Sequence, residues 1–170
     1  GPALAFWVFQ IVRNYLALLS EEPRSCLFPQ LARLRAMAVE LEAAVGPIDL
    51  VFGHNDLLAA NFLDDGERLW LIDWDYAGFN SPLFDLANLS SNNQFNADDD
   101  EALLEMYGLG RPDAARKRAF EAMKCASLMR ETFWGAVSEL RSTIDFDYAL
   151  YTRDYLQRLD AAWALFKARS

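Results

Sequence analysis

The most informative part of this sequence of 170 residues is the stretch Val51-Phe-Gly-His-Asn-Asp-Leu-Leu-Ala-Ala-Asn61. A short β-leaning run, Asp49 to Phe52, leads into a loop that carries Asp56 and, five positions later, Asn61. Phosphoryl transfer from ATP needs one group that orients or deprotonates the acceptor hydroxyl, together with oxygen ligands for magnesium. An Asp and an Asn separated by four residues meet this need in kinase catalytic loops. For this stretch alone, a loop whose Asp and Asn cap nearby backbone groups is an equally good interpretation.

A second acidic segment, Leu71-Ile-Asp-Trp-Asp-Tyr-Ala-Gly78, follows a β-leaning run that begins at Arg68. A carboxylate at the end of an apolar strand is costly to bury unless a partner neutralises it. Strand alternation predicts that Asp73 and Asp75 project to the same side, where a divalent cation relieves their repulsion. Magnesium prefers such a sparse set of oxygen ligands, completed by phosphate oxygens and water. The order and separation of the two segments therefore favour a catalytic magnesium site.

His54, the single histidine of the sequence, lies two positions before Asp56. A histidine in a catalytic loop suggests a general base. We favour a structural role, in which His54 hydrogen-bonds to the loop and to the second acidic segment. Asp56 then remains the candidate for the chemistry.

Most of the remaining sequence is predicted to be helical, because apolar residues recur at helical spacing. Ser81-Pro82 marks a helix start, since Ser is a good N-cap and Pro suits the first helical position. The acidic run 98–101 fits the positive start of a helix dipole better than a metal site. The predicted long helices span about 4–18, 29–45, 112–140 and 148–167. We expect an α+β fold that is mainly α-helical, a single domain over residues 1–170, with a small β element that carries the catalytic loop.

The composition argues against several classes of protein. A hydrophobic fraction of 53% is too high for a disordered chain, and a net charge of −9 argues against a nucleic-acid partner, which requires a basic face. The acidic surface suits a cationic ligand, or it serves solubility. The apolar opening is interrupted by Gln10, Arg13 and Asn14, which predicts no membrane insertion. Cys26 and Cys125 lack metal-ligand spacing and are expected to be buried thiols of a cytoplasmic protein.

Three segments together resemble the choline/ethanolamine kinase family. They are Gly53-His-Asn-Asp-Leu-Leu-Ala-Ala-Asn-Phe62, Leu71-Ile-Asp-Trp-Asp-Tyr-Ala-Gly78 and Pro82-Leu-Phe-Asp-Leu-Ala-Asn-Leu89. The strong resemblance covers residues 53–93, with weaker similarity through Tyr155. This family lies beside the aminoglycoside phosphotransferases in the protein-kinase-like fold. The resemblance implies the C-terminal lobe of that fold, Mg²⁺ as cofactor, ATP as co-substrate, and a small cationic amino alcohol, choline or ethanolamine, as substrate.

The resemblance also implies roles for individual residues. Asp56 is expected to be the catalytic base that faces the substrate hydroxyl. Asn61 and Asp73 are expected to be magnesium ligands, with Asp75 as a further acid beside the metal. Asp85 is expected to be structural, as the acceptor for backbone N–H groups of the catalytic loop.

An aromatic box for the substrate ammonium is a further implication, because ring faces attract a cation that cannot hydrogen-bond. Tyr76 matches one side of the box, Trp134 a second and Tyr151 a third. Val137 replaces the second Trp that eukaryotic choline kinases tend to carry, which thins the box and keeps choline and ethanolamine open as alternatives. Ordinary core packing is the alternative role for these aromatic residues.

Kinases of this fold need an upstream lobe that covers the phosphates and supplies a strand lysine. The lysines Lys117, Lys124 and Lys167 all follow the catalytic segment, so we expect the N-terminal ATP-binding lobe to be absent from this chain. The chain alone is then expected to turn over little, with self-association through the face that the lobe leaves open. Two alternatives remain. They are a kinase for another hydroxylated amine, such as an aminoglycoside or thiamine, and a non-catalytic binding module that keeps the fold.

Overall fold

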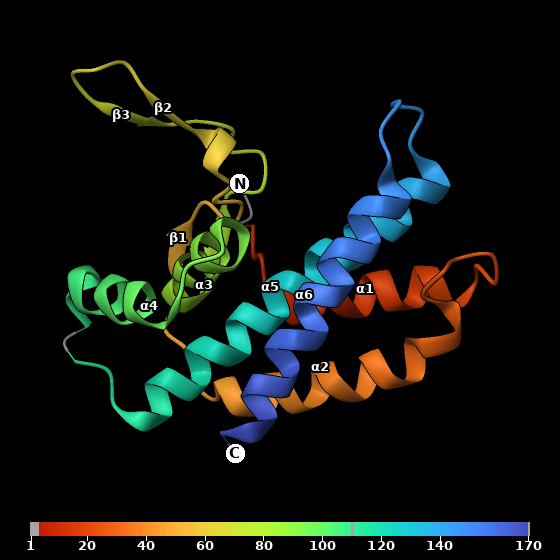
Figure 1. Ribbon diagram of the computed structural model, residues 1–170, viewed down its shortest axis with the longest axis horizontal. Helices are drawn as coiled ribbons and strands as arrows, with labels where there is room; N and C mark the ends of the chain where they lie inside the picture. The colour runs from red at the N-terminus through yellow and green to blue at the C-terminus, as the bar shows by residue number, and fades with distance from the viewer. Residues whose placement is uncertain (1–3, 110, 170) are drawn as a thin grey trace.

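Helix α5, Ala114–Arg141, is the element around which the other long helices pack. The computed structural model describes residues 4–109 and 111–169 of the predicted domain (Figure 1). Figure 1 shows α5 and α6 side by side, crossing α1 and α2. The bounds of these neighbours are α1 Val8–Ser20, α2 Leu31–Val45 and α6 Tyr148–Ala168. Large side chains from all of these helices are fully buried between them, among them Phe9, Leu34, Met129, Phe133 and Leu159.

Helix α5 is buried along most of its length because small residues let its neighbours approach. Ala122 and Ala126 lie in the core, and Gly135 faces α6. A Cβ atom at Gly135 would lie 2.6 Å from Oγ1 of Thr152, so α6 packs against α5 at a distance that requires glycine. The helix begins at Asp113, whose side chain accepts a hydrogen bond from the backbone N–H of Arg116.

Short antiparallel strands form two small β elements at one end of the helical layer. Strand β1, Val51–Gly53, pairs with β4, Gly78–Asn80. Strand β2, Phe62–Asp64, pairs with β3, Leu69–Leu71, and this hairpin projects away from the helices in Figure 1. The turn between β2 and β3 includes Gly66, whose φ of +87° lies in the region that favours glycine.

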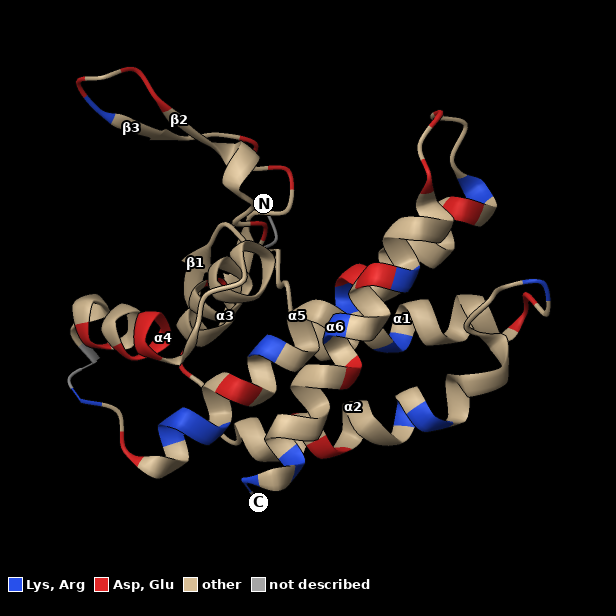
Figure 2. Cartoon of the chain, in the orientation of Figure 1, with Lys and Arg blue, Asp and Glu red and all other residues tan. Residues whose placement is uncertain are grey.

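Helices α3 and α4 connect the β elements to α5. Helix α3, Pro82–Asn93, begins after Ser81, whose hydroxyl accepts from the backbone N–H of Leu83, as the Ser-Pro pair predicts. Helix α4, Ala97–Leu104, starts with a capping box formed by Asn96 and Asp99. Figure 2 shows acidic residues gathered in its first turn, where the helix dipole favours them. The short helical turns are η1 Phe28–Gln30, η2 Ala59–Asn61 and η3 Glu105–Leu109.

Several expectations from the sequence are wrong in detail. The first helix begins at Val8, because residues 4–6 are extended: Phe6 N donates to the carbonyl of Phe79, and Phe79 N donates to that of Leu4. Cys125 is buried as expected, but Cys26 is exposed in the connection between α1 and η1. The strand expected to reach the second acidic segment ends at Leu71.

Within the described part of the chain, no helix combines the length and the hydropathy that a bilayer crossing requires.

Candidate active site

The loop between β1 and η2 is fixed by Asp85 of α3. Its carboxylate accepts hydrogen bonds from the backbone N–H groups of His54, at 2.8 Å, and Asn55, at 2.7 Å. Burial raises the pKa of Asp85 above its ordinary value, while these two hydrogen bonds act in the opposite direction. A Cβ atom at Gly53 would lie 2.7 Å from the same carboxylate, so glycine at this position lets Asp85 approach the backbone. This geometry fits the supporting role that the resemblance implies for Asp85.

Asn55 is the second element that shapes the loop. Its backbone has a φ of +66°, and its side-chain amide donates to the carbonyls of Gly53, Tyr76 and Gly78. The amide of Asn80 donates in turn to Asn55 Oδ1. The catalytic loop is thereby tied to β4 and to the end of the second acidic segment.

His54 uses both ring nitrogens within the site. Its Nδ1 accepts from the backbone N–H of Asp56 at 3.2 Å, and its Nε2 lies 2.8 Å from the carbonyl oxygen of Ile72. Because Nδ1 accepts and Nε2 faces an acceptor, the proton belongs on Nε2. The ring also packs edge-on against Trp74, with centroids 4.8 Å apart. This arrangement fits the structural role that we favour for His54.

Asn61 and Asp73 come from the two segments that were predicted to hold magnesium. The amide of Asn61 donates to the carbonyl of Asp56 at 2.9 Å, and the backbone N–H of Ile72 donates to the carbonyl of Asn61 at 3.0 Å. Asp73 follows directly, with a strained φ of +60°, and both it and Asp75 are exposed. The strand-alternation argument for these two acids fails, because β3 ends before them and the backbone at Asp73 is left-handed.

The oxygen atoms of Asn61, Asp73 and Asp75 are of the kind that magnesium binds. Asn61 directs its amide nitrogen to a backbone carbonyl, which leaves its Oδ1 as a ligand atom, and carboxylate oxygens follow at Asp73 and Asp75. Among the described residues, no three His, Cys, Asp or Glu side chains form a group that could hold a metal ion. A sparse protein ligand set of this kind relies on phosphate oxygens and water to complete the coordination.

Asp56 lies beside a buried arginine that the sequence did not single out. Nη1 of Arg130, on α5, lies 3.0 Å from Asp56 Oδ1, and the same nitrogen donates to Glu131. The guanidinium also lies over the ring of Tyr76, 4.8 Å from its centroid. Burial alone would lower the pKa of Arg130, but the charges of Glu131 and Asp56 raise it above its ordinary value, so Arg130 stays charged. A charged pair inside the otherwise apolar run of α5 was the signal that could have identified it.

Trp134 and Tyr151 meet where α5 and α6 approach each other. Their ring centroids are 5.3 Å apart at an interplanar angle of 65°, and Phe146 and Tyr148 extend the cluster. The hydroxyl of Tyr151 donates to Glu131 Oε2 at 2.8 Å, and burial raises the pKa of Tyr151. Tyr76 is linked to this cluster through the Arg130–Glu131 pair.

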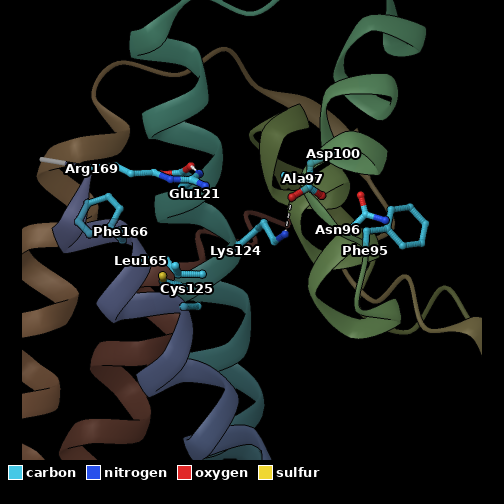
Figure 3. Close-up of a pocket in the computed structure, with 11 residues that line it drawn as sticks. Phe95, Asn96, Ala97, Asp100, Glu121, Lys124, Cys125, Leu165, Phe166 and Arg169 are labelled. Carbon is cyan, nitrogen blue, oxygen red and sulfur yellow. Dashed lines mark hydrogen bonds and ion pairs between the residues drawn. The ribbon is translucent and has the colours of Figure 1, made fainter.

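A separate cavity of about 230 Å³ lies between α4, α5 and α6 (Figure 3). It contains none of the predicted site residues. The charged groups at its edge are neutralised in pairs, because Lys124 contacts Asp100 and Arg169 contacts Glu121. Burial raises the pKa of Cys125, which lines the cavity, to about 12, so its thiol is unreactive near neutral pH.

Comparisons with known proteins show what this chain is similar to. A family model described as choline/ethanolamine kinase matches residues 5–120. Protein LicA of Haemophilus influenzae is 29% identical over 169 residues, which cover 95% of this chain and 48% of the relative. A probable ethanolamine kinase of Arabidopsis thaliana is 29% identical and matches over 88% of this chain and 46% of its own length. This chain therefore spans about half the length of these curated relatives.

One solved structure tests the predicted fold. The crystal structure of a choline/ethanolamine kinase family protein from Mesorhizobium loti is similar to this chain with a TM-score of 0.83 at 31% identity. The match covers 94% of this chain and 55% of that protein. It confirms the prediction of a mainly helical C-terminal lobe with a small β element.

Proposed function

Because this chain belongs to the choline/ethanolamine kinase family, we propose that it forms the catalytic half of an enzyme that transfers the terminal phosphoryl group of ATP to the hydroxyl of a small amino alcohol, choline or ethanolamine. The observation that carries the proposal is the loop from His54 to Asn61, which Asp85 and His54 fix beside the segment that bears Asp73. Phosphoryl transfer depends on positioning and charge stabilisation, and a rigid polar loop of this kind supplies both.

Asp56 is the group that accepts the substrate proton. As the hydroxyl oxygen forms its bond to the γ-phosphorus, its proton passes to the Asp56 carboxylate. The bond between the γ-phosphorus and the bridging oxygen breaks, and ADP leaves with that oxygen. Arg130 binds Oδ1 of Asp56, which leaves Oδ2 as the oxygen that faces the hydroxyl.

Asn61 and Asp73, with Asp75 beside them, are the residues that would hold Mg²⁺. When bound, the ion would neutralise charge on the transferred phosphoryl group and its leaving oxygen. The exposure of Asp73 and Asp75 supports this assignment, since phosphate oxygens and water can reach them.

Trp134 and Tyr151 are the residues that would receive the substrate ammonium. Their rings meet at an angle, so a cation at the mouth of the cluster contacts more than one π face. Glu131 accepts a hydrogen bond from the Tyr151 hydroxyl and so fixes the position of that ring. Such a site suits both a methylated and a primary ammonium group. For this reason choline and ethanolamine are proposed together.

The exposed apolar surface around the β elements supports a second lobe as part of the working enzyme. Large apolar side chains on and beside the strands are exposed in the chain alone, as is typical of a surface that contacts a partner. Among them are Leu50, Phe52, Leu63, Leu69, Trp70, Ile72 and Trp74. We infer that an ATP-binding lobe covers this surface, and that the isolated chain turns over little without it.

The test is an assay of the full gene product with ATP, Mg²⁺ and either choline or ethanolamine. Asp56→Asn is expected to lower kcat by about 100-fold or more, the usual range for the loss of a positioned proton acceptor. Asp154→Asn is the matched control, because Asp154 is an exposed acid on α6. Wild-type activity in Asp56→Asn would show that the chemistry does not depend on this loop.

The same assay separates the alternative functions. Phosphorylation of an aminoglycoside or thiamine, with choline and ethanolamine inert, would assign a different substrate to the same site. Binding of choline without turnover in the full gene product would favour a non-catalytic binding module.

A further inference from the structure

Arg130 and Glu131 form a buried ion pair beside Asp56 that neither donates nor accepts a proton in the proposed phosphoryl transfer. Both are almost fully buried on α5, with 2% and 3% of their surface exposed. A buried ion pair usually contributes little net stability, because desolvation offsets the attraction between its charges. Because the pair contacts the Asp56 carboxylate, a role in orienting that carboxylate explains its presence better than a contribution to stability.

The pair joins two parts of the proposed site that are far apart in the sequence. On one side, Nη1 of Arg130 binds Oδ1 of Asp56 at 3.0 Å. On the other side, Oε2 of Glu131 accepts a hydrogen bond from the hydroxyl of Tyr151 at 2.8 Å. Asp56, Arg130, Glu131 and Tyr151 thus form one continuous chain of polar contacts from the catalytic loop to the aromatic cluster.

Arg130 also contacts two aromatic rings. Its guanidinium lies 4.8 Å from the ring centroid of Tyr76 and 5.7 Å from that of Phe6. These cation–π contacts and the carboxylates in reach of its N–H groups restrict where the guanidinium can move. Asp56 therefore binds a partner whose own position is fixed.

We propose that Arg130 is a positioning residue. Glu131 and Tyr151 hold Arg130, and Arg130 orients the Asp56 carboxylate toward the substrate hydroxyl. This contact chain links the orientation of Asp56 to the site that binds the substrate ammonium. This inference rests on the proposed function. The carboxylate of Asp56 can rotate about two side-chain bonds, and a misplacement of about 1 Å is enough to cost about 100-fold in rate. The bond from Arg130 fixes one oxygen and thereby directs the other.

The central variant is Arg130→Lys, assayed in the full gene product with ATP and whichever of choline or ethanolamine the wild type phosphorylates. Lysine keeps the buried positive charge but lacks the planar, forked geometry of the guanidinium. We expect kcat to fall about 10- to 100-fold while KM for the amine changes less than about threefold. A residue that is only structural would instead lower the melting temperature and the active fraction, and kcat corrected for the active fraction would stay at the wild-type value.

Tyr151→Phe tests the far end of the chain. It removes the hydroxyl that binds Glu131 and keeps the ring that faces the ammonium. We expect kcat to fall about three- to tenfold, and the effects of Tyr151→Phe and Arg130→Lys to be non-additive, because both act on Asp56 through Glu131. Tyr107→Phe is the control with unchanged kcat, since Tyr107 is exposed in η3.

The double variant Arg130→Met/Glu131→Leu covers the case in which a single change prevents folding. Replacement of a whole buried ion pair by apolar residues of similar volume usually preserves the fold. We expect a folded enzyme with the kcat loss of Arg130→Lys or a larger one. Wild-type kcat in folded Arg130→Lys and in the double variant would overturn this inference and leave the proposed function intact. A wild-type gene product that phosphorylates neither amine would overturn both.

Discussion

The Oδ1 atom of Asp85 lies 2.7 Å from the backbone nitrogen of Asn55, a residue whose φ is +66°. A non-glycine residue in the left-handed region is strained by about 1 kcal/mol or more, so neighbouring contacts must stabilise it. Asp85 supplies one such contact, and the carbonyls that accept from the Asn55 amide supply others. The shape of the loop that carries Asp56 therefore depends on a residue of α3 that lies 30 positions later in the chain.

Asp85→Asn is expected to destabilise the protein by about 2 kcal/mol, the usual cost of losing a hydrogen bond to a charged group. An asparagine oxygen can accept from one of the two backbone N–H groups, but the amide nitrogen then faces the other. Urea unfolding measures the loss. The activity of the full gene product should fall as well, because Asp56 directly follows the two residues whose backbone Asp85 holds.

Asp98→Asn is the control for this change, because Asp98 is an exposed acid in the first turn of α4. It should shift the free energy of unfolding by less than about 1 kcal/mol, as expected for a surface charge near a helix start. An Asp85→Asn protein as stable as the wild type would mean that the loop keeps its shape without the carboxylate.

Local signals in the sequence predicted the helices well. Ser81 caps the helix that follows it, and the four long helices appear within a few residues of their predicted bounds. These features depend on residues close together in the chain, where spacing and capping chemistry are informative. The loop from His54 to Asn61 was also singled out by local spacing, and the roles of its residues stay predictions.

Long-range contacts were beyond such signals. Arg130 and Asp56 are separated by 74 positions. The apolar pattern of a helix does not indicate which distant residue a charged side chain on that helix will contact. The positions of Asp73 and Asp75 were misjudged because strand alternation does not extend past the end of β3, and a left-handed residue reverses the local direction of the backbone. Tyr76 was expected to face a substrate cation, and one of its faces is in contact with Arg130.

Trp134→Leu is expected to raise the KM for choline about 3- to 30-fold, because a cation–π contact contributes about 0.5–2 kcal/mol and leucine offers no π face. The effect on ethanolamine should be smaller, since a primary ammonium also forms hydrogen bonds. Steady-state assays with both amines measure it. Trp163→Leu is the matched control: its ring stacks on Phe166 near the C-terminal end of α6 and should not affect either KM. Equal changes in the two variants would indicate lost packing instead of lost substrate contact.

Gly135→Ala is expected to destabilise the protein by about 1–3 kcal/mol, the usual cost of overpacking a core. Helix propensity alone predicts the opposite, a gain of about 1 kcal/mol, so the sign of the change is diagnostic. The new Cβ would lie 2.6 Å from Oγ1 of Thr152 and 2.9 Å from Cδ1 of Tyr151. Thermal unfolding measures the stability. Thr152→Ala in the same chain should restore part of the loss, and failure to do so would place the strain elsewhere.

Stability is expected to fall between pH 9 and 12 in a way that depends on Cys125. Burial raises the pKa of this thiol from 9.0 to about 12, so in this window the unfolded chain releases a proton that the folded chain retains. The folded state binds more protons, and the free energy of unfolding therefore falls as pH rises, by at most about 1.4 kcal/mol per pH unit. The contribution is fully present below pH 9. Urea unfolding of wild type and Cys125→Ser at pH 8.0, 9.5 and 10.5 isolates it, because Lys and Tyr residues titrate equally in both proteins. A difference between the two proteins that stays constant over this range would mean that Cys125 is accessible to solvent in the folded state.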